Sequence, residues 1–185
     1  MSSTEPARAD GRRNRQLILE AAGLALLDNP QASITEVAER AGVTRATVYR
    51  HYADRDALLQ AMATETARQI VPALLDELRP LPWIEALDLL AERVVSTGEA
   101  YRDIILTVAP QLEQAVRIAV EDEPIQAEIA IRRAKGEVTT PQPDDWMALC
   151  MRAVCIAAIG RLADPAVQRD ELVTHLAASL RGLAI

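Results

Sequence analysis

The chain has 185 residues, half of them hydrophobic, and a formal net charge of −7. This apolar content excludes a disordered tail and is sufficient for one or two small domains with cores of their own. The polar first 15 residues lack the apolar segment of a signal peptide, and no uninterrupted apolar stretch is long enough to cross a membrane. The spacing of Cys150 and Cys155 is not that of a disulfide framework, so we expect free thiols and a cytoplasmic protein.

Leu, Ala, Ile and Val must fill the interior, because phenylalanine is absent and aromatic residues make up only 3% of the chain. Together with Glu and Arg, these residues favour helices, and no sustained alternation of apolar and polar residues indicates a sheet. We therefore predict an all-α fold. The charge is uneven: residues 1–60 carry eight Arg and eight Asp or Glu, whereas residues 61–185 carry the whole excess of −7. The N-terminal third is thus the part best suited to approach a polyanion.

Three helices are expected in this N-terminal third, and the first covers residues 11–28. The second starts after Ser33, whose spacing to Glu36 is that of a capping box. It stops at Gly42, because glycine tolerates the left-handed conformation that ends a helix. Thr44 is a suitable N-cap for a short third helix that runs to about residue 52.

A fourth helix is expected to start after Asp54 and to run to about residue 70, where Pro72 ends or kinks it. Further helices are expected at residues 82–98, 103–108, from 110, from 124, at 144–161 and at 164–182. The clearest loop is 135–143, which contains Gly, Thr and Pro without an apolar period. The inner face of the helix after Pro82 is expected to consist of Ile84, Leu87, Ala91, Val94 and Gly98.

Two short helices joined by a tight glycine-containing turn form a helix-turn-helix, whose second helix lies in the DNA major groove. Side chains suited to this contact gather on the expected third helix. The fork of Arg45 matches the O6 and N7 edge of guanine, and Ala46 and the Thr47 methyl group can contact a thymine methyl group. Tyr49 and His51 follow at the far end of the helix, with the length needed to reach phosphates.

A resemblance to the tetracycline-repressor (TetR) family is carried by residues 33–59, SITEVAERAGVTRATVYRHYADRDALL. The matching features are a hydroxyl residue shortly before Val-Ala, then Ala-Gly-Val, a second hydroxyl residue, and Tyr-x-His before an aromatic residue. Tyr52 replaces the commoner Phe, and Arg55 stands where Lys is usual. The resemblance covers about residues 10–60. It implies an N-terminal three-helix head that binds DNA and a C-terminal helical domain that binds an effector and dimerises.

We accordingly divide the chain into a DNA-binding domain, residues 1–53, and an effector-binding and dimerisation domain, residues 54–185. The predicted DNA-binding residues are Thr35, Thr44, Arg45, Ala46, Thr47, Tyr49, His51, Tyr52, Arg55 and Arg12. Alternatives remain for several of them. Tyr49 and Tyr52 can instead pack in the core of the head, while Arg12 and His51 can be solvated without touching DNA.

Aromatic and sulfur-containing side chains of the second half can line an effector cavity or simply fill the core. These residues are Trp83, Tyr101, Trp146, Met147, Cys150 and Met151. Small residues on the penultimate helix and a leucine stripe on the last one predict a four-helix bundle between two copies of the chain. The residues predicted at this interface are Ala153, Ala157, Gly160, Leu172, Leu176 and Leu180.

The sequence therefore favours a homodimeric, DNA-binding transcriptional regulator. The resemblance to TetR proteins implies a repressor that an unidentified small molecule releases from a palindromic operator. We expect no enzymatic activity and no cofactor or metal, because the sequence offers no His/Cys cluster, glycine-rich phosphate loop or nucleophile–base pair. A helical adaptor that binds only other proteins remains the alternative.

Overall fold

The computed structural model describes residues 5–108 and 124–184, and within these ranges the regular structure is entirely helical. The helices are α1 (Glu5–Asp28), α2 (Ile34–Ala41), α3 (Arg45–His51), α4 (Arg55–Leu78), α5 (Trp83–Ala100), α7 (Pro124–Ala134), α8 (Asp144–Arg161) and α9 (Arg169–Ala184). A further helical stretch covers 102–108. No helix of the described part of the chain is long and apolar enough to cross a membrane.

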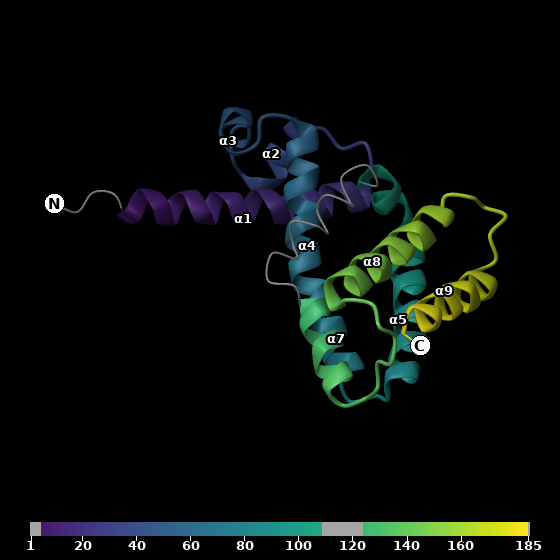
Figure 1. Cartoon of the computed structure of the whole chain (residues 1–185). Coiled ribbons are helices and arrows are strands. Elements are labelled where there is room, and N and C mark those ends of the chain that lie inside the picture. The colour runs from purple at the N-terminus through teal and green to yellow at the C-terminus, as the bar shows by residue number, and fades with distance from the viewer. Residues whose placement is uncertain (1–4, 109–123, 185) are drawn as a thin grey trace.

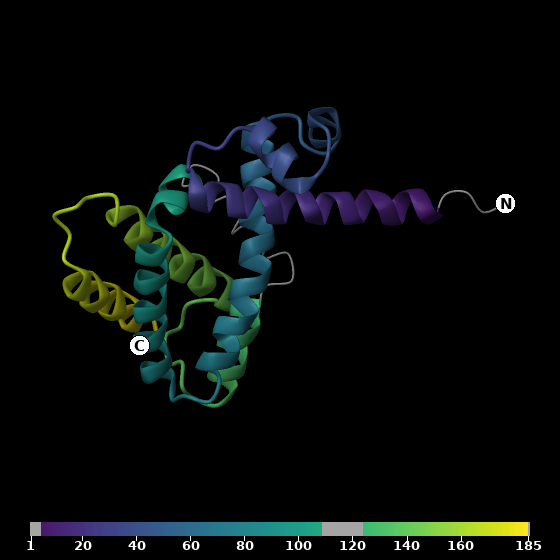
Figure 2. The same cartoon turned by 180° about the vertical axis from the view of Figure 1, so that it is seen from behind.

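The molecule consists of two helical bodies joined by α4 (Figure 1). In the upper body of that view, α1, α2 and α3 pack together, and the N-terminal turns of α1 project past the other helices. The lower body contains α5, α7, α8 and α9. Seen from behind, α1 again crosses beside α4, in agreement with the contacts between these two helices (Figure 2). The α3 helix lies at the end of the molecule farthest from the C-terminal body.

Each body has its own hydrophobic core. The core of the N-terminal body, called the head below, combines α1 to α3 with Leu58, Leu59 and Met62 from the first turns of α4. Ile104 and Val108 of the short stretch also pack against it. The second core begins with Leu78 at the far end of α4. The first part of α4 thus packs with the head, although the boundary drawn at residue 53 places it in the next domain.

Three expected helix boundaries differ from the structure by more than two residues. The first helix starts at Glu5 rather than at residue 11. The fourth continues through Pro72 to Leu78. A proline inside a helix removes one backbone hydrogen bond, but Leu75 and Leu78 beyond it are buried, and their packing favours continuing the helix. The last helix begins at Arg169, not at residue 164.

The delayed start of α9 has a local cause. The Asp164 carboxylate accepts a hydrogen bond from the Ala166 backbone N–H at 2.9 Å, and the Val167 N–H donates to the Asp164 carbonyl at 3.2 Å. These bonds form a turn, the competing structure that Asp favours. The helix that we expected from Pro110 falls outside the described residues.

The inner face of α5 also differs from the expected one. Ile84 is exposed, whereas Trp83, Leu87, Ala91 and Val95 are buried at steps of four residues. Gly98 continues this face as expected. A Cβ atom there would overlap the Leu162 Cδ1 atom, so a larger residue at this position would force the Leu162 side chain to shift.

The far end of α4 is fixed by a buried arginine of α7 that the sequence did not single out. Only 1% of Arg132 is exposed. Its guanidinium donates to the carbonyl oxygens of Leu78, Arg79 and Leu81 at 2.7 to 3.2 Å. It also donates to the Glu128 and Glu137 carboxylates at 2.9 and 2.8 Å. Burial alone would lower the pKa of Arg132, but the bonds with Glu137 and Glu128 raise it above its usual range.

Candidate nucleic-acid interface

The turn between α2 and α3 is built by local hydrogen bonds. The Ser33 hydroxyl accepts from the Glu36 N–H at 3.3 Å, and the Ser33 N–H donates to the Glu36 carboxylate at 2.7 Å. These reciprocal bonds form the predicted capping box. At the other end of α2, Gly42 adopts a left-handed conformation with φ of 67°. The predictions for both ends of α2 are confirmed.

Two features fix α3 relative to the head. The Thr44 hydroxyl caps the helix by accepting from the Thr47 N–H at 3.1 Å, as predicted. One edge of the helix is buried, because Val48 is fully inaccessible and Tyr52, just after the helix, is 6% exposed. A seven-residue helix is too short to be stable alone, so these contacts with the head core hold it in place.

The opposite edge of α3 faces solvent. Arg45, Ala46, Tyr49 and Arg50 are exposed there, and Thr47 is half-buried beside them. These side chains combine a guanidinium fork, apolar groups, a phenol and a hydroxyl on one short helix. Arg50 was not among the predicted contact residues, although its place in the same segment was a signal that could have included it.

Arg45 and Tyr49 contact each other on this exposed edge. The Arg45 Nη2 atom donates to the Tyr49 hydroxyl at 3.2 Å. The Arg45 Cζ atom lies 5.3 Å from the centroid of the Tyr49 ring, a distance within the range of a cation–π contact. The Thr44 and Thr47 hydroxyl oxygens, 2.9 Å apart, form a second polar pair on the first turn.

Two residues predicted to touch DNA have mainly internal surroundings. Tyr52 lies in the core of the head, as in the alternative role of packing, and its direct contact with DNA stays a prediction. Burial raises the pKa of Tyr52, although Arg15 offsets part of this shift. His51 is half-buried, and its Nε2 atom is inaccessible and without a hydrogen-bond partner among the described residues.

Arg55 has a structural role that we did not predict. Its Nε atom donates to the Ala32 carbonyl at 3.1 Å, and its Nη2 atom donates to the Pro30 carbonyl at 2.9 Å. The side chain therefore ties the start of α4 to the segment before α2. A phosphate contact by Arg55 remains a prediction, as do contacts by the exposed residues Thr35 and Arg12.

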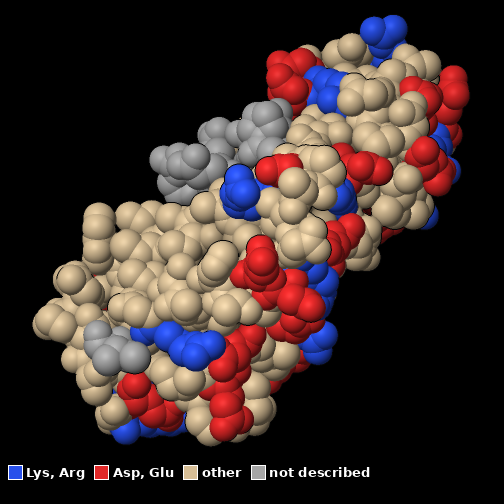
Figure 3. Space-filling model, turned by 90° about the vertical axis from the view of Figure 1, so that its right-hand side faces the viewer, with Lys and Arg blue, Asp and Glu red and all other residues tan. Residues whose placement is uncertain are grey.

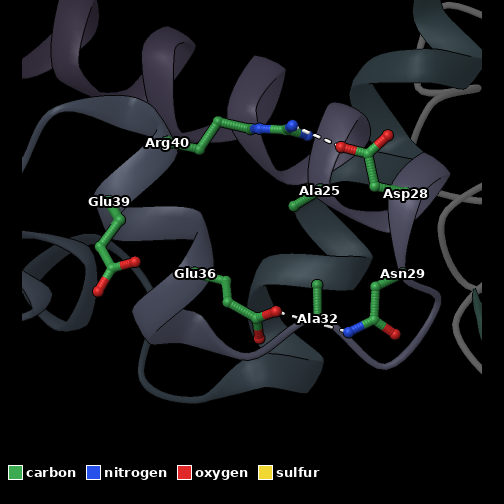
Figure 4. A pocket seen from close by; sticks show the side chains of 7 residues that line it. All are labelled: Ala25, Asp28, Asn29, Ala32, Glu36, Glu39 and Arg40. Atoms are coloured by element: carbon green, nitrogen blue, oxygen red, sulfur yellow. Dashed lines mark hydrogen bonds and ion pairs between the residues drawn. The ribbon is translucent and has the colours of Figure 1, made fainter.

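A shallow hollow lies between the end of α1 and α2 (Figure 4). Its polar lining is mainly acidic and includes Asp28, Glu36 and Glu39. The one basic residue of the lining, Arg40, is turned toward Asp28 and forms an ion pair with it. This balance of charge disfavours phosphate in the hollow and leaves α3 as the better surface for DNA.

Comparisons with known proteins agree with this geometry. Residues 30–62, which include α2 and α3, match the family model described as bacterial regulatory proteins, tetR family. The transcriptional repressor LfrR from Mycolicibacterium smegmatis is 45% identical over 62 residues. This match covers 32% of the chain and 33% of LfrR, so the chain spans about a third of the length of this curated relative.

The fold similarity extends over nearly the whole chain. FadR from Thermus thermophilus, solved with lauroyl-CoA and described as a TetR family repressor, is 22% identical with a TM-score of 0.72. The similarity covers 91% of this chain and 92% of FadR. LfrR, solved with proflavine, is 28% identical over 94% of this chain and 97% of its own, with a TM-score of 0.56. The helix-turn-helix segment of the chain therefore matches the TetR family, and the whole chain has the fold of solved TetR regulators.

The residues that we predicted to bind an effector do not share one environment in the structure. Trp83, Met147 and Met151 are buried in the C-terminal core, whereas Tyr101 and Trp146 are about half exposed. Trp83 packs against Arg132, whose Cζ atom is 5.3 Å from the ring centroid. Cys150 is half-buried. The structure thus supports core packing for three of these residues and leaves their contact with an effector a prediction.

The predicted dimer residues separate into two groups. On α8, Ala153, Ala157 and Gly160 are exposed, together with Trp146 and Leu149. These residues recur every three or four positions and form one uncharged stripe, called the α8 stripe below. On the side of the molecule where α9 lies, Figure 3 shows a broad area of the C-terminal body with few charged side chains.

The leucines of α9 are not on such a surface. Leu172, Leu176 and Leu180 are at most 8% exposed and belong to the core of their own chain, where α9 packs against α5 and α8. Their side chains thus pack within one chain, and their assignment to a dimer interface stays a prediction. The apolar stripe was read correctly, but its neighbour is α5 of the same chain, which the sequence could not show.

Proposed function

We propose that the chain is a homodimeric, sequence-specific transcriptional repressor whose α3 helix enters the major groove of its operator. The observation that carries this proposal is the solvent-facing edge of α3. Arg45, Ala46 and Tyr49 lie there on a helix that is capped at Thr44 and anchored by Val48. Such an edge at the free end of the molecule is accessible to a duplex without interference from the C-terminal body.

The charge distribution supports specific rather than general DNA binding. Residues 61–185 carry a net charge of −7, which repels the phosphate backbone, while the N-terminal residues 1–60 are neutral. The few arginines on the head then have to supply the contacts.

DNA binding can be tested with the region upstream of the protein's own gene. We expect the purified protein to shift this DNA and to protect a palindromic site in footprinting. Arg45→Ala should relax the base preference at one position of each half-site by about 1–3 kcal/mol. The matched control is Arg68→Ala, an exposed arginine of α4. Failure to shift any genomic fragment at low salt would favour the protein-binding adaptor over the repressor.

A dimer through the α8 stripe would place two copies of α3 about one DNA turn apart, roughly 34–36 Å. Ala157→Arg should then yield folded monomers that bind the operator poorly, because it puts a charge in the middle of the stripe. Ala130→Arg, at an exposed position of α7, is the control and should remain dimeric. Sedimentation velocity separates the two results, and a dimeric Ala157→Arg protein would place the interface elsewhere.

We also propose a small-molecule effector that lowers operator affinity by binding the C-terminal body. LfrR and FadR were solved with ligands of opposite charge, namely proflavine and lauroyl-CoA. The acidic second half of this chain favours a cationic ligand over an anionic one. Proflavine should therefore raise the melting temperature and release the operator more effectively than lauroyl-CoA does. The reverse order would overturn the cationic assignment.

A further inference from the structure

The contact between Arg45 and Tyr49 defines the orientation of the arginine before any DNA is present. Arg45 is the first residue of α3, and Tyr49 lies four positions later, on the same face of the helix. The hydrogen bond of 3.2 Å fixes one end of the guanidinium. The distance of 5.3 Å to the ring centroid brings the guanidinium over the face of the phenol.

This orientation matters because an unrestrained arginine has many rotamers, and base recognition requires only one of them. A side chain that is already ordered loses less rotamer freedom when it binds. The ring of Tyr49 can act as a support because the helix beneath it is fixed by the buried neighbours Val48 and Tyr52. On a mobile helix, ordering the arginine side chain would not fix its position relative to the DNA.

The contact also leaves the guanidinium able to read a base. An arginine has five N–H donors, and the bond with the tyrosine hydroxyl uses one of them. Bidentate recognition of guanine requires two. Arg45 is exposed, and so are Tyr49, at 42%, and Ala46. A base edge can therefore approach without displacing buried groups.

We propose that Tyr49 is a positioning residue for specificity, which holds the Arg45 guanidinium in the orientation used to read one base pair of each half-site. This inference rests on the proposed function. It differs from the expectation that Tyr49 mainly contacts a phosphate, since a phosphate contact would contribute equally at every sequence.

The test is a double-mutant cycle with a randomised operator library. Tyr49→Phe removes the hydroxyl and keeps the ring, whereas Tyr49→Leu removes both contacts. We expect Arg45→Ala to lower the preference at one position by about fivefold to a hundredfold. Tyr49→Leu should lower it at the same position by about twofold to fivefold, with a smaller loss for Tyr49→Phe. The double variant should lose no more base preference at this position than Arg45→Ala alone.

A measurement without DNA provides an independent readout. The Nε–H relaxation of Arg45 should indicate a more mobile side chain in Tyr49→Leu than in the wild type. Arg50→Ala, an exposed arginine variant on the same helix, should leave the Arg45 signal unchanged. Both tyrosine variants are expected to fold, because the residue lies on the surface, and thermal melting checks this.

Several results would overturn the proposal. A uniform loss over all sequences in Tyr49→Leu, with a weaker salt dependence, would make Tyr49 a phosphate contact. Tighter operator binding by Tyr49→Leu would mean that DNA must break the contact between Arg45 and Tyr49. If Arg45→Ala leaves every base preference intact, Arg45 does not read a base, and Tyr49 cannot act by positioning it. The proposed function fails separately, when the wild-type protein binds no operator at all.

Discussion

The two ends of α4 are both held by an arginine that donates to backbone carbonyls, but in very different surroundings. At the head, Arg55 donates to Pro30 and Ala32 from a half-buried position. At the far end, the fully buried Arg132 donates to three carbonyls and two carboxylates. A bond network in the interior resists water and rearrangement more than two bonds near the surface do. We therefore expect α4 to be fixed at its far end and to move, if it moves, at the head.

Arginines also connect α7 and α9 to their neighbours in the C-terminal body. Arg133 donates to Asp144 and to the carbonyls of Thr140 and Gln142, and so holds the loop that leads into α8. Arg169 forms ion pairs with Glu92 and Glu99 of α5. In the head, Arg40 forms an exposed ion pair with Asp28. This contrast gives the following predictions, from the largest expected effect to the smallest.

Removing Arg132 should cost the most stability. Arg132→Met keeps an apolar stem but leaves the Glu128 carboxylate, only 5% exposed, with Arg79 as its remaining ionic partner. Breaking a buried ion pair in this way costs about 3–5 kcal/mol. Urea denaturation measures the loss. Arg133 lies one residue later, and its side chain is 31% exposed. Arg133→Met should therefore lose clearly less stability than Arg132→Met. Equal losses of stability in the two variants would show that burial does not set the cost of removing the arginine.

Removing Arg55 should have a smaller and local effect. Arg55→Met loses two charge-assisted hydrogen bonds in a half-buried position, at a cost of about 2 kcal/mol. Hydrogen exchange should become faster in the segment before α2 while the C-terminal body keeps its protection. Arg40→Met, which removes an exposed ion pair of the head, should cost less than about 1 kcal/mol. Faster exchange throughout the molecule would show that the two ends of α4 are not independent.

The two glycines with positive φ offer a matched comparison between the bodies. Gly42 in the head and Gly136 after α7 have φ of 67° and 76°, and a Cβ atom would meet no neighbour at either position. Alanine at each site should therefore cost about 1–2 kcal/mol through backbone strain alone. Calorimetry should show a similar loss of stability for both variants, whereas operator binding should weaken more in Gly42→Ala than in Gly136→Ala. Equal effects on binding would mean that the turn before α3 has no special role.

The smallest expected effect concerns acid stability. The backbone and hydroxyl of Ser33 lower the pKa of Glu36. A carboxyl whose pKa is lower in the folded state stabilises the fold above the ordinary glutamate pKa, and this contribution disappears as the pH falls through the lowered value. Glu36→Gln should therefore flatten the loss of stability of the head in acid. Glu39→Gln controls for removing a negative charge from α2, and an identical flattening there would contradict the role of the cap.

Glu137 is the counterpart of Glu36 in the C-terminal body. Its hydrogen bond with Arg132 holds its pKa below the usual range, so its contribution is also lost as the pH falls. In the same body, burial raises the pKa of Cys155 to about 12, which keeps this thiol protonated and unreactive at neutral pH. Among these groups, the acid response of the head thus involves a helix cap, and that of the C-terminal body an ion pair between the half-buried Glu137 and the buried Arg132.

Much of the head followed from the sequence because its signals are local. The capping box at Ser33, the glycine at position 42 and the caps at Thr44 and Asp54 each involve residues within four positions of one another. The limits of α8 were also predicted correctly. In contrast, the expected end of the fourth helix near Pro72 was wrong, since packing of Leu75 and Leu78 outweighs one lost hydrogen bond.

By itself, the sequence determined the helical class, the helix-turn-helix and the side chains on its outer edge, because caps, turns and periodicity act over a few residues. Only the tertiary structure decided what distant segments do to one another. It placed Tyr52 inside the head, turned the leucines of α9 toward α5, and brought Arg132 to carbonyls about 50 residues earlier. Burial and long-range hydrogen bonds depend on which faces meet, and periodicity alone does not specify the partner of a face.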